Sequence, residues 1–152
     1  MVLALRAILV GSDYDRFQRN LDLLFTVSLL FATFAAYALG LFQATGGVII
    51  VPGDATLVGF VAAIGIGLRR GSLLVAWLFP FAAYLGFQAD WALLGLSSHS
   101  LGGKLAFFFD PVGLAVLAVA AVVIGTFGFA LGYLFQWCID LFRRYSTVGD
   151  DQ

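Results

Sequence analysis

The sequence predicts an all-α integral membrane protein in which four transmembrane helices form a bundle. Hydrophobic residues make up 62% of the 152 positions and charged residues only 11%, whereas soluble globular chains carry about 25% charged residues. Long apolar runs alternate with short segments that hold arginine, or glycine, proline and aspartate. This number of charged residues is too small to cover a water-exposed surface. We therefore expect lipid to cover most of the surface of the protein. At this length we expect a single membrane domain, over residues 1–144.

The first crossing is expected at residues 23–42, an uncharged run. A hydrocarbon layer about 30 Å thick requires roughly 20 apolar residues in a helix, which this run supplies. Ahead of it, Ser12 and Asp15 have the spacing of a capping box, so the helix is expected to begin in that segment. The Gly46-Gly47 pair is expected to end it.

The second crossing is expected at residues 48–68, with a break at 52–54. A β-branched run comes first, Pro52-Gly53-Asp54 interrupts it, and a glycine-rich helix follows. The run at 48–51 either completes the crossing as irregular backbone or lies flat at the surface. Irregular backbone at membrane depth survives only where protein or a water-filled cavity surrounds it.

The third crossing is expected at residues 73–96, after a tight turn in which Ser72 is a plausible N-cap. Pro80 falls inside this helix, and neighbouring helices are expected to satisfy the carbonyl group that it frees. A polar and then aromatic loop is predicted over 97–109.

The fourth crossing is expected at residues 111–137, with the helix continuing to Arg144. Asp110-Pro111 predicts its start, because an acidic N-cap followed by proline at the first helical position is a typical helix beginning. The two ends of the chain are expected to differ. Residues 1–11 are apolar but short, and predict a helix lying in the cytoplasmic interface; residues 145–152 predict a disordered cytoplasmic tail.

Basic residues predict the orientation, because cytoplasmic segments of membrane proteins are enriched in lysine and arginine. One side of the four-pass arrangement holds all of the arginines: Arg6, Arg16, Arg19, Arg69, Arg70, Arg143 and Arg144. The other side holds only Lys104. We therefore expect a multi-pass protein of the cell membrane with both termini in the cytoplasm. A bias toward Asp and Arg suggests a GC-rich prokaryotic genome.

Small residues recur every four positions, a pattern that lets helices in lipid approach closely. They are Ser28, Ala32, Ala36 and Gly40 on the first crossing, Gly59 and Ala63 on the second, Ala82 and Gly86 on the third, and two pairs on the fourth, Ala121 with Gly125 and Gly128 with Gly132. These grooves either pack the chain's own bundle, or one of them, Gly128 with Gly132 in particular, forms a homo-oligomer or docks a partner.

Asp54 is the main candidate for a functional residue. It precedes Arg69 by fifteen positions, which is roughly 22 Å of helix, so it would lie within the hydrocarbon layer. Three other polar residues lie fourteen or fifteen positions from a charged residue at the cytoplasmic boundary: Tyr37 from Asp22, Tyr84 from Arg70 and Thr126 from Asp140. They are therefore expected at about the same depth as Asp54, with Gln43 and Gln88 above them. Such a polar layer would hold a cation, a proton or a small polar solute. Alternatively, Asp54 is only a helix-start signal, since an acid in the first turn suits the helix dipole.

Other chemistries have little support in the sequence. A single cysteine, Cys138, excludes an intramolecular disulfide, and no basic stripe indicates nucleic-acid binding. His99 with outer aspartates would be a metal site, but it lies in a serine-rich segment that is typical of a solvated loop. We therefore expect no metal, no cofactor and no enzymatic activity; an enzyme acting on lipid would lack a nucleophile and a base.

Two functions remain. The first is a non-catalytic scaffold or accessory subunit within the lipid bilayer, as a homo-oligomer or part of a larger membrane complex. The alternative is a small transporter or channel for a cation, a proton or a small polar solute, which would use the outward-facing layer around Asp54.

Overall fold

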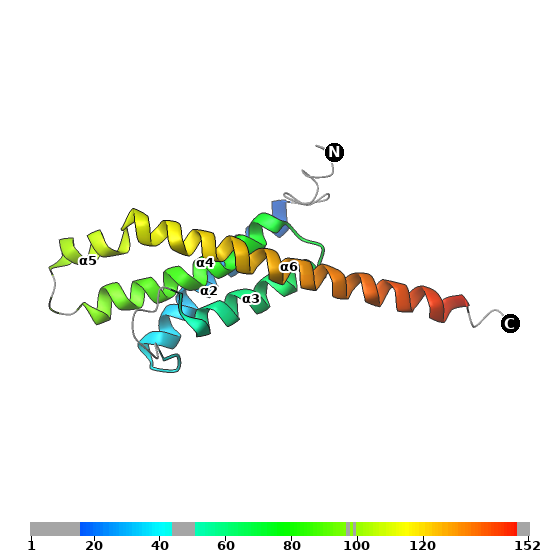
Figure 1. Ribbon diagram of the computed structural model, residues 1–152, viewed down its shortest axis with the longest axis horizontal. Coiled ribbons are helices and arrows are strands. Elements are labelled where there is room, and N and C mark those ends of the chain that lie inside the picture. Colours follow the sequence, from blue (N-terminus) through cyan, green and yellow to red (C-terminus); the bar gives the residue numbers. More distant parts are fainter. Residues whose placement is uncertain (1–15, 44–50, 97, 99, 149–152) are drawn as a thin grey trace.

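A computed structural model describes residues 16–43, 51–96, 98 and 100–148, and this part of the chain is helical without strands. Its elements are α2 (Arg16–Ala38), α3 (Gly53–Leu68), α4 (Leu73–Asp90), the π-helical turn η1 (Trp91–Gly95), α5 (Leu101–Phe108) and α6 (Pro111–Val148) (Figure 1). Three stretches are long and apolar enough to cross a membrane, namely Asn20–Ala38, Leu73–Gly95 and Leu101–Arg143. Helix α3 is apolar but shorter, with 16 residues. The segments predicted as an interfacial helix at 1–11 and a stop at Gly46-Gly47 lie outside the described residues.

Helix α2 ends earlier than the sequence predicted. Its last residue is Ala38, and Gly40 then adopts a φ of 71°, a left-handed conformation that glycine reaches without steric cost. The Gly40 amide donates to the Tyr37 carbonyl at 2.9 Å, which closes this turn. The helix end is therefore set by Gly40 and not by residue 42 or beyond.

The segment after α4 is more regular than the loop that we expected over 97–109. The α-helical pattern stops at Asp90 and passes into η1, where the Leu96 amide donates to the Trp91 carbonyl at 3.0 Å. Helix α5 then occupies Leu101–Phe108, and the Ser100 side chain caps it by accepting from the Gly103 amide at 3.3 Å. The prediction failed because the segment is too short to show helical periodicity.

Helix α6 is longer than the predicted crossing. Asp110 caps its start by accepting from the Gly113 amide at 2.7 Å. The helix continues to Val148, so residues 145–148 are helical and are not part of a disordered tail. No glycine or proline interrupts the sequence between Gly132 and Gly149, which leaves nothing to end the helix sooner. In Figure 1 its last part runs past the ends of the other helices.

Helix α4 lies at the centre of the bundle, where it contacts α2, α3 and α6, and α3 also packs along α6. At these contacts, glycine brings backbones together so closely that an added Cβ atom would overlap the neighbour. The contacts are Gly59 with Pro80, Gly67 with Gly132, Gly86 with Leu30, Gly125 with Ala76, and Gly128 with Ala63. Side chains of α4 fill the two buried apolar clusters, around Tyr84 and around Phe79.

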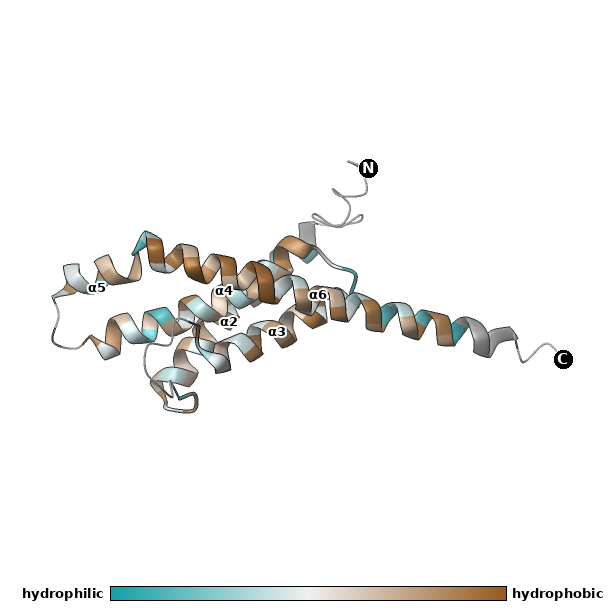
Figure 2. Cartoon of the chain, viewed as in Figure 1, coloured by the Kyte–Doolittle hydropathy of each residue, from teal (hydrophilic) through white to brown (hydrophobic). Residues whose placement is uncertain are grey.

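The predicted small-residue grooves fall into two groups. Those of the later helices are buried in the bundle: Gly59, Ala63, Ala82, Gly86, Ala121, Gly125, Gly128 and Gly132. On α2, by contrast, Ser28 and Ala32 are exposed and Ala36 is half-buried, and Gly40 is exposed in the turn that follows the helix. The face of α2 that packs on α4 instead holds the buried Thr33 and Tyr37, because Gly86 on α4 supplies the small residue at that contact. Figure 2 shows that most of α6 alongside the other helices has the colour of strongly hydrophobic residues.

Candidate functional site

Asp54 lies in the first turn of α3, which begins directly after the buried, extended Pro52. Its carboxylate is half-buried, and Oδ2 accepts a hydrogen bond of 3.2 Å from the backbone amide of Gln43. An acid in the first turn interacts favourably with the helix dipole. Asp54 thus has the surroundings of a helix-start residue and also ties the segment after α2 to the start of α3.

Tyr84 is fully buried where α4 faces α3. Its hydroxyl lies 3.1 Å from the Thr56 hydroxyl, which itself donates to the Pro52 carbonyl at 2.8 Å. Tyr84 is therefore the donor to Thr56. Thr56 was missed as a candidate, although it lies one helical turn after Pro52, where a threonine hydroxyl can reach the carbonyl group four residues earlier.

Tyr37 belongs to the same buried cluster as Tyr84 and Ala55. Its ring packs edge-on against Phe42 and Phe87, with centroid distances of 5.3 and 5.0 Å. The hydroxyl is buried, has no hydrogen-bond partner among the described residues, and lies near the backbone of Ala55.

Thr33 shares this property one turn earlier on α2: its hydroxyl is buried and has no partner in the described part of the chain. Other threonines in these helices do bond the carbonyl four residues earlier, at 2.6–2.8 Å; they are Thr26, Thr56 and Thr126. Thr33 is thus held by packing alone, at the point where α2 approaches Gly86.

The remaining members of the predicted polar layer lie elsewhere. Thr126 is exposed and accepts a hydrogen bond of 2.9 Å from the Trp77 indole. Gln88 donates to the Phe107 carbonyl at 3.4 Å. The fold therefore brings Tyr37, Tyr84 and the start of α3 together, but not Thr126 or Gln88, because spacing along a helix fixes depth and not the direction in which a side chain points.

An ion pair between Arg70 and Asp140 lies at the end of the bundle opposite Asp54. The Arg70 guanidinium donates to the Asp140 carboxylate at 2.6 Å, and Gln136 donates to the same carboxylate at 3.1 Å. Arg70 has a φ of 51°, its amide bonds the Gly67 carbonyl, and the Gly71 amide bonds the Ile66 carbonyl. This pair of bonds is a Schellman motif, which ends a helix through one left-handed residue.

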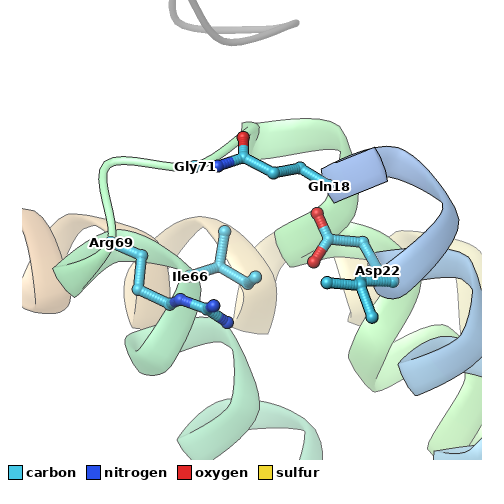
Figure 3. Close-up of a pocket in the computed structure, with 6 residues that line it drawn as sticks. Gln18, Asp22, Ile66, Arg69 and Gly71 are labelled. Atoms are coloured by element: carbon cyan, nitrogen blue, oxygen red, sulfur yellow. The ribbon is translucent and has the colours of Figure 1, made fainter. Parts of the chain in front are cut away.

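A small pocket of about 60 Å³, with both polar and apolar lining residues, lies beside this turn (Figure 3). It is lined from α2 by Gln18, Leu21 and Asp22, and from the end of α3 and the turn by Ile66, Arg69 and Gly71. Asp22 and Arg69 lie on opposite sides of it. The two neighbouring arginines of the turn therefore contact different helices: Arg69 lines this pocket beside α2, and Arg70 binds Asp140 on α6.

An apolar groove of about 340 Å³ lies between α4 and α6, lined by Leu74, Trp77, Leu78, Phe81, Ala118, Ala121 and Val122. Within the described residues, no three His, Cys, Asp or Glu side chains gather as a metal site would require. His99 lies outside those residues, and Cys138 is an exposed free thiol.

Comparison of the chain with known protein families, with characterised proteins and with solved structures finds no match.

Proposed function

We propose that the chain is a four-pass protein of the cell membrane, in which α3 crosses in addition to the three longer apolar stretches, and that both termini are in the cytoplasm. The arrangement of charges supports this topology. Arg69 shares a pocket with the beginning of α2, and Arg70 pairs with Asp140 near the end of α6. Lys104 belongs to the opposite end, on α5. Arginine thus gathers at one end of the bundle, as the enrichment of basic residues on the cytoplasmic side requires.

Cysteine labelling tests this topology. In a Cys138→Ser background, Gly102→Cys would present a thiol on α5, where residue 102 is exposed. A membrane-impermeant maleimide should label this variant in intact cells. It should label the native Cys138 only after the cells are opened. Labelling of both thiols from the same side in intact cells would refute the topology.

We further propose that the protein is a non-catalytic scaffold or accessory subunit. The observation that carries this proposal is the local bonding of the polar groups that would otherwise form a transport layer. Asp54 is bonded by Gln43, Tyr84 by Thr56 and Thr126 by Trp77. Polar side chains are thus used to join neighbouring segments of the bundle.

We propose that an exposed apolar face of α2 binds a protein partner. Helix α2 packs on α4 through one face, and its remaining surface exposes large apolar side chains: Leu23, Leu24, Phe25, Val27 and Phe31. Lipid covers such a surface in an isolated subunit, and a helix of another membrane protein, or of a second copy, covers it in a complex.

Photo-crosslinking in native membranes tests the scaffold role. A photoreactive residue at Phe31, which is 63% exposed, should give a discrete protein adduct. The same residue at Phe109 is a matched control, because Phe109 is 62% exposed but lies beyond α2 on the α5–α6 connection. Lipid adducts alone at Phe31 would contradict the proposal.

The transport alternative rests on the unpartnered Tyr37 hydroxyl near the start of α3. Reconstituted vesicles with an imposed pH or cation gradient test it. Transport through this site requires a flux that Asp54→Asn abolishes and that Asp110→Asn, which keeps a capping side chain at α6, leaves unchanged. An absence of flux with folded wild-type protein would exclude the alternative.

A further inference from the structure

The pocket between α2 and the α3–α4 turn combines two opposite charges with an apolar floor. Its volume of about 60 Å³ is several times the roughly 10–15 Å³ needed to admit one water molecule. Figure 3 shows the Gln18 amide above, and the Arg69 and Asp22 side chains on either side of Ile66. Ile66 is only 4% exposed and Leu21 is half-buried.

The turn directs Arg69 to this pocket. Because the left-handed Arg70 closes α3 and pairs with Asp140 on α6, the preceding side chain is free to lie on the α2 side. Asp22 makes other contacts within the chain, but a carboxylate offers several lone pairs and accepts more than one hydrogen bond. The pocket therefore presents a cationic donor and an anionic acceptor on facing walls.

The position of the pocket identifies its surroundings. It lies beside the first residues of the apolar stretches Asn20–Ala38 and Leu73–Gly95, and beside the last residues of α3. In the proposed topology this is the cytoplasmic boundary between the hydrocarbon layer and the lipid headgroups. Basic pockets between transmembrane helices on this side bind the anionic headgroups of cardiolipin and phosphoinositides, and the present pocket differs from them by the Asp22 carboxylate that faces Arg69. Leu21 and Ile66 give the pocket an apolar lining next to its charged groups.

We propose that this pocket binds the headgroup of a phospholipid that carries both a phosphate and a primary ammonium group. The phosphate would accept hydrogen bonds from the Arg69 guanidinium, whose planar fork matches phosphate oxygens, and from the Gln18 amide. The ammonium group would donate to the Asp22 carboxylate. An anionic headgroup without an amine would leave Asp22 facing a like charge, and a choline headgroup has no N–H to donate. The inference is independent of the scaffold role.

Lipid binding to the purified full chain in detergent tests the proposal. The probes are phosphatidylethanolamine, phosphatidylglycerol and phosphatidylcholine with identical acyl chains, and binding is measured by native mass spectrometry. We expect phosphatidylethanolamine to bind about tenfold more tightly than either of the others, a difference of about 1.4 kcal/mol. Equal binding of the three lipids, or tighter binding of phosphatidylglycerol, would overturn the proposal without any variant.

Charge-neutralising variants assign the binding to the pocket. Asp22→Asn should remove the preference for phosphatidylethanolamine over phosphatidylglycerol, whereas Arg69→Gln should weaken both. Asp110→Asn and Lys104→Gln remove the same charges at the opposite end of the bundle and should change nothing. An unchanged preference in a folded Asp22→Asn variant would overturn the assignment. Soluble O-phosphoethanolamine carries the same phosphate and ammonium groups without acyl chains. If it binds as tightly as phosphatidylethanolamine, the ligand is not specifically a membrane lipid and that part of the proposal is overturned.

Discussion

The hydroxyl groups of Thr56 and Tyr84 lie 3.1 Å apart and join α3 to α4 inside the bundle. Thr56 passes the interaction on to the Pro52 carbonyl, so the start of α3 is fixed to the middle of α4 by a short chain of hydrogen bonds. Because Tyr84 is fully buried, its hydroxyl has no access to water as a substitute partner.

Thr56→Val should therefore destabilise the protein by about 1–3 kcal/mol, since a buried donor left without its acceptor loses the full desolvation penalty. Thermal or denaturant unfolding in detergent measures this change. Tyr84→Phe in the Thr56→Val background should add little further loss. If the two single substitutions were additive, the hydroxyl pair would not be a coupled interaction.

Thr33→Val should have little effect on stability, or raise it. The Thr33 hydroxyl is buried with no partner in the described residues, so replacing it with a methyl group of similar shape removes an unsatisfied polar group. The same unfolding experiment with Thr56→Val provides the comparison. A loss as large as that of Thr56→Val would show that Thr33 has a hydrogen-bond partner in the folded protein.

Two glycines in α3 should respond in opposite ways to alanine. A Cβ on Gly67 would overlap the Phe129 carbonyl, whereas a Cβ on Gly65 has nothing within 4 Å. Gly67→Ala should separate α3 from α6 and lower the unfolding temperature. Gly65→Ala should raise stability by about 0.5–1 kcal/mol, because glycine inside a helix carries an entropic cost. Equal effects would mean that α3 and α6 are not in contact there.

Arg70→Gly should be less damaging than Arg70→Ala. Both lose the pair with Asp140, which is worth at most about 1 kcal/mol for exposed partners, and the Arg70 side chain is 55% exposed. Only glycine relieves the left-handed backbone, which costs an ordinary residue about 1–2 kcal/mol. Unfolding temperatures of the two variants decide this, and an alanine variant as stable as the glycine one would refute the strain argument.

Helix positions followed from the sequence where local signals are strong. The start of α6 at Asp110-Pro111 and the turn after Leu68 were both predicted, because each is formed by hydrogen bonds between residues a few positions apart. The end of α2 was mispredicted because a single glycine, Gly40, decided it. Helix α5 was missed because eight residues give too little periodicity.

The candidate site was harder to predict because it depends on rotation about each helix axis. Equal spacing from the charged ends placed Tyr37, Tyr84 and Thr126 at one depth, yet Thr126 bonds Trp77 and lies apart from the two tyrosines. Thr56 was overlooked because its partner is supplied by a different helix. Arg69 lies beside α2 and Arg70 beside α6 because Arg70 has a left-handed φ, and the sequence does not predict that angle.

The short third helix has a consequence for the surrounding bilayer. With 16 residues, α3 rises about 24 Å, and it presents Leu57 and Val61 outward. If α3 crosses the bilayer as we propose, lipids beside it meet a hydrophobic wall shorter than the usual hydrocarbon thickness of about 30 Å, whereas those beside the 38-residue α6 do not. Such a mismatch is relieved by local thinning, so the membrane should be dimpled on one flank of the protein, and a thin bilayer should accommodate it with less distortion than a thick one.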